Sequence, residues 1–325
     1  MIANPDLRAL RRDDSPQCDA QDALAQAGDA WRARPAVAAM LKQLETFAAG
    51  ADLADCPALA ALFTPGSNAA RDLAVDFSEA TSAALAAWPL GHVPLRHFTD
   101  GITSTVLIAR AVNVTLSLVA IDGEGLGRRP ESASASFGPN QTWEYVLGGS
   151  AAVELVECQP TGPRQAQLHC REVEIGTGSI QYRDGQRDAR LLRRIDGALV
   201  TLRLQRRRAN AEVTREYDLA SGALLHQAAG NPRDSRLELM LAMLGRMGRT
   251  DAAPHMAELA LGEASAALRW QALRECLALD TQVGFTALAR IAARAEDALS
   301  GPAGALRAQL IEAHPQLQEV ELCLM

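Results

Sequence analysis

Trp143–Glu157, WEYVLGGSAAVELVE, has the pattern of two short β-strands separated by a pair of glycines. Polar and apolar residues alternate on both sides of the glycines, and this two-residue period is typical of a half-buried strand. The predicted strands are Thr142 to Leu147 and Ala152 to Glu157. Gly148-Gly149 can adopt the positive φ that a tight turn requires, so the segment predicts an antiparallel hairpin.

The same alternation assigns the side chains of the first strand to its two faces. Trp143 and Tyr145 share one face, which we interpret as core rather than as a stacking surface for a ligand. Glu144 lies on the opposite face of the strand.

Short alternating runs with turns between them continue from about Val93 to Gln227. Further strands are predicted at Gln167–Ile175, Arg190–Ile195, Leu199–Gln205 and Glu212–Leu219. Further turns are predicted at Asp184-Gly185, Asp196-Gly197 and Ser221-Gly222. So many strands without intervening helices favour an antiparallel jelly-roll β-barrel over a parallel α/β sheet, and we place this β domain at residues 93–230.

Helices are predicted on both sides of the β domain, which makes the fold class α+β. Within residues 1–92, one amphipathic helix begins at Pro35 and stops near Gly50, and another spans Asn68 to Trp88. The helical rhythm returns in residues 231–325, where short polar connections predict antiparallel helical hairpins.

The C-terminal stretch Arg236–Leu310 resembles HEAT-type helical repeats, most clearly at Ala267–Ala293. A solenoid generally needs about three repeats to bury a continuous core. We therefore expect this tail to pack on the β domain or on a second subunit, and we expect a homo-oligomer.

The opening segment also resembles the first conserved motif of the cupin superfamily, in which a glutamate precedes a VL-x-G turn and an alternating strand. Val173–Leu192, VEIGTGSIQYRDGQRDARLL, resembles the second motif, with Gly178 in the usual glycine position. The resemblance covers Phe98 to Tyr217 and implies a jelly-roll fold. It also implies that Glu144 stands at the position of the glutamate ligand.

The metal ligands that the resemblance would imply are missing from the sequence. Cupins that bind iron, manganese or zinc place an H-x-H pair before the glutamate, whereas this chain has Phe137 to Gln141 there. Arg187 and Asp188 occupy the place where a histidine is expected in the second motif. We therefore predict no metal and no cofactor in the β domain.

A second hypothesis places a metal site at the start of the β domain. His92, His97 and Asp100 could hold a metal if a turn gathered them. The alternative is a linker whose histidines make ordinary hydrogen bonds.

Arginines near the second motif suggest another ligand. Arg183 and Arg187 could approach a barrel mouth, and guanidinium groups there could clamp a carboxylate or phosphate. His169 would share a strand face with Arg171. The candidate ligand-binding residues are therefore Glu144, Arg183, Arg187 and His169, and the expected partner is a small anionic molecule. The alternative is that these arginines form the solvated rim of a turn.

The composition excludes several other classes of partner. A net charge of −7 and a charged fraction of 22% argue against nucleic acid and against an anionic membrane. Arg206-Arg207-Arg208 is accordingly interpreted as a solvated turn. The chain start lacks the apolar core of a signal peptide, and the most apolar stretch is broken by Arg110 and Asn113, so we expect a cytoplasmic protein without a membrane span.

Two hypotheses about function follow. The first is a cupin-like protein without catalysis that binds a ligand or mediates protein contacts. The second is a cupin-type enzyme, a dioxygenase, isomerase or lyase, with an atypical or metal-free site. Fold alone does not choose between them.

Overall fold

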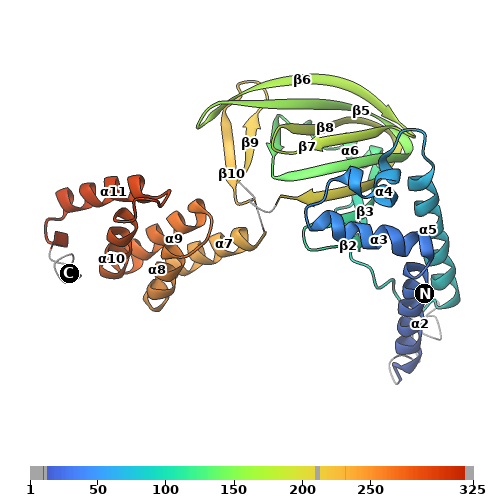
Figure 1. Cartoon of the computed structure of the whole chain (residues 1–325), viewed down its shortest axis with the longest axis horizontal. Coiled ribbons are helices and arrows are strands. Elements are labelled where there is room, and N and C mark those ends of the chain that lie inside the picture. The colour runs from blue at the N-terminus through green and yellow to red at the C-terminus, as the bar shows by residue number, and fades with distance from the viewer. Residues whose placement is uncertain (1–9, 11–12, 209–212, 231, 319–325) are drawn as a thin grey trace. The chain divides into compact units, whose positions relative to one another are not determined.

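The computed structural model describes residues 10, 13–208, 213–230 and 232–318 (Figure 1). The chain forms two compact units, one of residues 1–210 with 215–226 and one of residues 211–214 with 227–325. The N-terminal helices and the strands belong to the first unit, apart from the first residue of the ninth strand and the last two residues of the tenth. Their division into separate domains at residues 92 and 93 stays a prediction.

Helices begin the first unit. They are α2 (Ser15–Arg32), α3 (Pro35–Ala48), α4 (Pro57–Ala60) and α5 (Ala69–Ala87), with 3-10 turns η1 (Leu53–Asp55) and η2 (Ala61–Phe63). Pro35 occupies the first turn of α3, and Gly50 follows the helix with a φ of 114°, as the sequence predicts. The helix predicted at Asn68 is also confirmed, with Asn68 as the N-cap of α5.

The strands of the first unit form two antiparallel sheets. They are β1 (His97–Thr99), β2 (Thr103–Arg110), β3 (Val114–Asp122), β4 (Ser134–Phe137), β5 (Asn140–Gly162), β6 (Gln165–Gly176), β7 (Ile180–Asp184), β8 (Asp188–Arg207), β9 (Thr214–Asp218) and β10 (Leu224–Ala228), with the short helix α6 (Gly123–Gly127) after β3. The larger sheet has the order β1-β2-β3-β8-β5-β6, with β7 also paired to β5, and the smaller has the order β10-β9-β4. The mixture of helix and antiparallel sheet agrees with the prediction. The described strands do not close into the expected jelly-roll barrel.

The glycine pair of the opening segment is a bend and not a hairpin turn. β5 runs through it for 23 residues, with register shifts around Gly148. Gly149 has a φ of 88°, and a Cβ there would lie 2.0 Å from the carbonyl oxygen of Ala198 on β8. Gly197, predicted as another hairpin turn, lies inside β8. Bulges of this kind bend a strand without ending it, which is why two pairs of predicted strands merge.

The bend divides β5 between different partners. Its first part pairs with β7 and with the second part of β8, whereas its second part pairs with β6 and the first part of β8. Figure 1 shows the long strands curving over one another. Residues from both parts of β8 can therefore meet at one place.

One face of the larger sheet packs on the N-terminal helices. Phe47 of α3 is fully buried there, with its ring 5.5 Å from that of Trp143. Arg206 closes this contact: its guanidinium lies 4.0 Å from the centre of the Phe47 ring and donates to the carbonyl oxygen of Ala51 at 2.8 Å. The interpretation of Arg206 as part of a solvated turn is therefore wrong, because its position inside β8 directs it toward α3.

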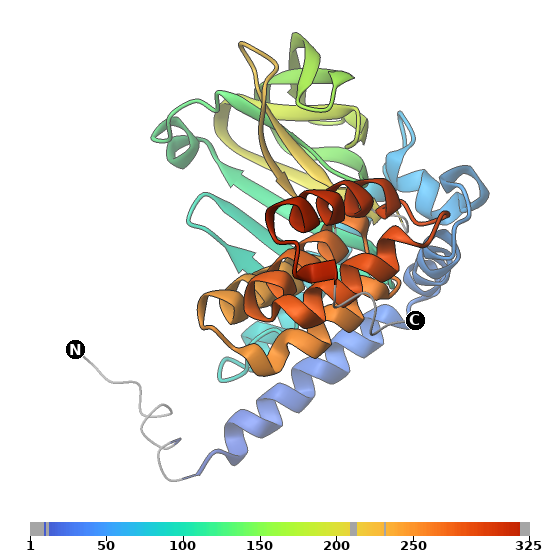
Figure 2. The same ribbon diagram turned by 90° about the vertical axis from the view of Figure 1, so that its left-hand side faces the viewer.

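The second unit is helical (Figure 2). It contains α7 (Pro232–Arg246), η3 (Thr250–Ala252), α8 (Ala253–Leu261), α9 (Ala266–Leu279), α10 (Thr281–Ala292) and α11 (Ser300–Ala313). The side chains of Ser265 and Asp280 cap α9 and α10 by accepting backbone N–H bonds. Helices are thus confirmed here, and the HEAT-type assignment stays a prediction. Among the helices described in either unit, none is both long and apolar enough to cross a membrane.

Candidate functional site

Glu144 lies in the middle of the larger sheet. Its strand, β5, is flanked by β7 and β8, so that Glu144 is opposite Gln181 on one side and Arg203 on the other. Trp143 and Tyr145 contribute to the core beneath the helices, as the alternation predicts. Glu144 faces the other side of the sheet and is fully buried.

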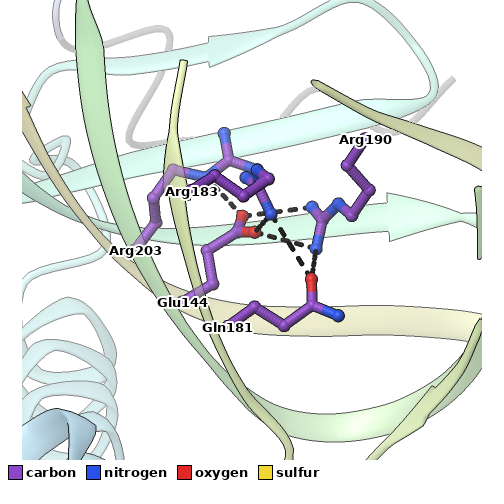
Figure 3. A network of polar contacts seen from close by, with 5 residues as sticks. All are labelled: Glu144, Gln181, Arg183, Arg190 and Arg203. Atoms are coloured by element: carbon purple, nitrogen blue, oxygen red, sulfur yellow. Dashed lines mark hydrogen bonds and ion pairs between the residues drawn. The ribbon is translucent and has the colours of Figure 1, made fainter. Parts of the chain in front are cut away.

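Three arginines surround the Glu144 carboxylate (Figure 3). The Nε of Arg203 donates to Oε1 at 2.7 Å. Oε2 of Glu144 lies 2.7 Å from Nη1 of Arg183 and 2.8 Å from Nη1 of Arg190. Gln181 joins the cluster because its Oε1 accepts from Arg190 at 3.1 Å. We call these five residues the Glu144 cluster.

The cluster carries more positive than negative charge. Three guanidinium groups surround one carboxylate, which leaves a surplus of two positive charges. The side chain of Arg190 is only 5% exposed, that of Arg183 14% and that of Arg203 27%. Water therefore screens this surplus poorly.

The pKa values follow from burial and charge. Burial by itself would raise the pKa of the Glu144 carboxyl. The surrounding guanidinium charges outweigh the effect of burial and hold the pKa far below its usual value, and Arg190 contributes the most among them. Burial lowers the pKa of Arg190 to about 10; Glu144 opposes this change, and the two other arginines add to it. At neutral pH Glu144 is an anion and Arg190 a cation.

Two buried oxygens of this region lack a directed hydrogen bond within the part of the chain that the structure describes. One is Oε2 of Glu144, whose two close contacts are its ion pairs with Arg183 and Arg190. The other is the hydroxyl of Thr201, two residues before Arg203 and hence on the same face of β8. Such atoms are infrequent in folded proteins and favour a water molecule or ligand nearby.

Two cavities border the cluster. One, of about 360 Å³, is lined by both Arg183 and Arg190. The other, of about 560 Å³, is lined by Arg183, Gln181 and His169. Arg183 thus lies between two spaces that a small molecule could enter.

The structure brings some of the predicted site residues together. Glu144 and Arg183 are in direct contact, and His169 lines a cavity with Arg183 without joining the cluster. Arg187 is exposed at the turn between β7 and β8, outside the cluster. Arg187 was predicted because of its place in the second motif of the family resemblance, and the structure does not bring it to the cluster. Arg183 points into the cluster because it lies on the inner face of its strand.

Sequence reasoning missed Arg190 and Arg203. A signal for Arg203 exists in the pattern of β8, where Thr201, Arg203 and Gln205 form a polar face opposite Leu202 and Leu204. Arg190 gives no such signal, because its approach to Glu144 depends on the bend of the sheet.

The alternative metal site near residue 92 does not form. Asp100 uses one carboxylate oxygen to accept from the backbone N–H groups of Ile102 and Thr103, and the other faces Arg129. No group of three histidine, cysteine or acidic side chains suited to a metal exists among the residues that the structure describes. The Glu144 cluster does not fit a metal either, since three guanidinium groups repel a cation.

Comparisons with known proteins add little to this geometry. No protein-family model and no curated protein matches the chain. Parts of it are similar to many solved structures, among them hydroxypropylphosphonic acid epoxidase from S. wedmorenis (9% identity, 34% of this chain and 55% of that chain, TM-score 0.25), KdgF from Halomonas sp. (14%, 36% and 88%, 0.25) and HutD from Pseudomonas fluorescens SBW25 (18%, 35% and 55%, 0.24). The chain thus spans about half the length of the epoxidase. Likeness at such TM-scores assigns neither family nor function.

Proposed function

We propose that the first unit binds a small anionic molecule at the Glu144 cluster. The observation that carries this proposal is the buried surplus of two positive charges around a single carboxylate. Burying an uncompensated charge is unfavourable, and an anion beside the arginines would offset that cost. Guanidinium groups suit this task because their fixed fork of donors matches a carboxylate or phosphate.

Arg183 and Arg190 are the residues that we expect to meet the anion. Both line the cavity of about 360 Å³, which lies within the usual size range of small-molecule sites, about 300–1,000 Å³. The Glu144 carboxylate holds these arginines in place from the other side. An anion in the cavity would also raise the depressed pKa of Arg190.

Binding suits the cluster better than acid–base catalysis by Glu144. A general base needs a pKa near the working pH, whereas the arginines hold the pKa of Glu144 far below it. We therefore assign Glu144 the role of an internal counter-ion.

The test compares two arginines that lie four residues apart. Titration calorimetry with acetate and inorganic phosphate should show at least a tenfold loss of affinity in Arg183→Gln. Arg187→Gln, which alters an exposed arginine outside the cluster, should bind as the parent does. Arg203→Gln serves as a second cluster variant if Arg183→Gln fails to fold. Equal binding by all these variants, or no binding of either anion to the parent, overturns the proposal.

Self-association of the second unit is a further part of this proposal. Three methionines and a leucine in or next to α7 are exposed, with exposed fractions from 54% to 63%: Leu239, Met240, Met243 and Met247. Apolar side chains three and four residues apart form a stripe, and a second copy of the same stripe could cover it. Light scattering at tens of micromolar should report a dimer for the parent and a monomer for Met243→Lys. A monomeric parent rejects self-association.

A further inference from the structure

The cavity beside Arg183 and Arg190 has a lining that distinguishes among anions. Its remaining wall is made of side chains and backbone from β4, β5, β8 and β9 and their connections: Ser132, Ser134, Ser136, Gly138, Asn140, Thr142, Gly185, Asp188, Ala189, Leu191, Gln205 and Glu216. Only Ala189 and Leu191 of these have apolar side chains. The wall is therefore built for hydrogen bonds and not for an acyl or aromatic group.

Much of this hydrogen-bonding capacity is unused. Among the described residues, Ser136, Asn140, Thr142 and Gln205 make no side-chain hydrogen bond with the protein. Thr142 is nevertheless only 7% exposed. Buried polar side chains are normally paired, so these groups suit a partner that both donates and accepts.

Strand register places the unused groups beside the arginines. On the inner face, Gln181, Glu144 and Arg203 are aligned across β7, β5 and β8. The next row on the same face is Arg183, Thr142 and Gln205. Successive residues on one strand face are about 7 Å apart, so a ligand several atoms long can touch both rows.

The acidic groups of the wall limit how many charges the ligand can carry. Asp188 accepts a backbone hydrogen bond from Asp184, and Glu216 accepts from the hydroxyl of Ser134. Both carboxylates retain further acceptor positions. They would repel a polyanion, but they can accept from hydroxyl groups.

We infer that the ligand is a polyhydroxylated molecule with a single anionic group, the chemistry of a sugar acid or a sugar monophosphate. The anionic group binds Arg183 and Arg190, and the hydroxyl groups bind Thr142, Gln205 and the neighbouring wall. This inference rests on the proposed anion site and adds the class of molecule that the site takes.

Calorimetry with five probes separates the parts of this inference. D-gluconate and glucose 6-phosphate carry hydroxyl groups and an anion, acetate and inorganic phosphate carry only the anion, and glucose carries only hydroxyl groups. We expect one hydroxylated anion to bind at least tenfold more tightly than the bare anion with the same charged group, and glucose to show no binding. Whichever of the two binds more tightly identifies the carboxylate or the phosphate as the anionic group.

The variant Thr142→Val tests the hydroxyl contacts because it removes one hydroxyl and keeps the shape of the side chain. It should weaken binding of the hydroxylated anion at least fivefold and leave the bare anion unaffected. Thr161→Val, at an exposed position of β5 outside the cavity, is the matched control. If bare and hydroxylated anions bind equally, the anion site stands and the polyhydroxylated class is rejected. If no anion binds, the anion site itself is rejected.

Discussion

Each of the two units buries an acidic side chain against arginine, but the charges balance differently. In the second unit, Arg269 of α9 meets Asp297 in the connection before α11, and the two side chains are 11% and 8% exposed. Arg269 also donates to the carbonyl oxygen of Ala260, and Asp297 accepts from the backbone N–H of Leu299. In the first unit, one carboxylate faces three guanidinium groups.

The difference separates a structural contact from a candidate site. The Arg269–Asp297 pair is neutral and links α8, α9 and the start of α11. Hydrogen bonds lower the pKa of Asp297, and the bond from Arg269 has the largest effect. This carboxylate therefore has its partners within the protein. The Glu144 cluster keeps unbalanced charge and borders two cavities. The presence of a buried ion pair therefore does not by itself indicate a binding site. A surplus of charge among the buried groups does favour one.

The largest expected effect comes from removing the single negative charge of the cluster. Glu144→Gln leaves three arginines without a counter-ion, and we expect the free energy of unfolding to fall by about 3–5 kcal/mol. Chemical denaturation of the full chain measures this change. Glu172→Gln, at an exposed position of β6, should stay within about 0.5 kcal/mol of the parent. A loss of under about 1 kcal/mol in Glu144→Gln would mean that the arginines need no internal counter-ion.

Sequence patterns predicted the elements of this molecule better than their ends. The alternation around Glu144 and the helices after Pro35 and Asn68 follow from local periodicity and capping, which act within a few residues. The merging of two predicted strands into β5 does not, because a glycine with positive φ serves a bulge as readily as a hairpin. Pairing with β8 on both sides of the glycines decides that the chain forms a bulge and not a hairpin.

The candidate site was predictable only where it depends on local sequence patterns. Glu144 and Arg183 were found because they lie in recognisable motifs, one row apart on adjacent strands. Arg190 reaches Glu144 from a chain position 46 residues away, across the bend of the sheet. Such a contact depends on register and curvature, which a single sequence does not reveal.

The second prediction concerns the bend that brings the two parts of β8 to one place. Gly149→Ala imposes a side chain at a φ of 88° and against the Ala198 carbonyl, so the free energy of unfolding should fall by about 1–3 kcal/mol. Gly176→Ala, at a glycine of ordinary φ with open space around it, is the control. Anion affinity should fall in the first variant only. Unchanged affinity in Gly149→Ala would show that the bend does not position the arginines.

The smallest expected effect is a dependence on pH that belongs to Glu144 alone. The pKa of this carboxyl is lower in the folded chain than its ordinary value of 4.5. Above pH 4.5 both the folded and the unfolded chain carry the charge, so the stabilisation is fully present. Below that pH the unfolded chain takes up a proton that the folded chain does not, and the stabilisation is lost by roughly 1.4 kcal/mol per pH unit.

Comparison with Glu144→Gln isolates this contribution, because glutamine does not titrate and every other acidic group is common to both proteins. The difference in unfolding free energy between parent and variant should be constant from pH 7 to about 5 and should narrow as the pH falls further. Asp297, whose pKa is also lowered, contributes equally to both curves and cancels. Urea denaturation at half-unit steps of pH measures the difference. Parallel curves down to about pH 3 would mean that the arginines do not depress the pKa of Glu144, and the contrast between the two buried clusters would then lose its electrostatic basis.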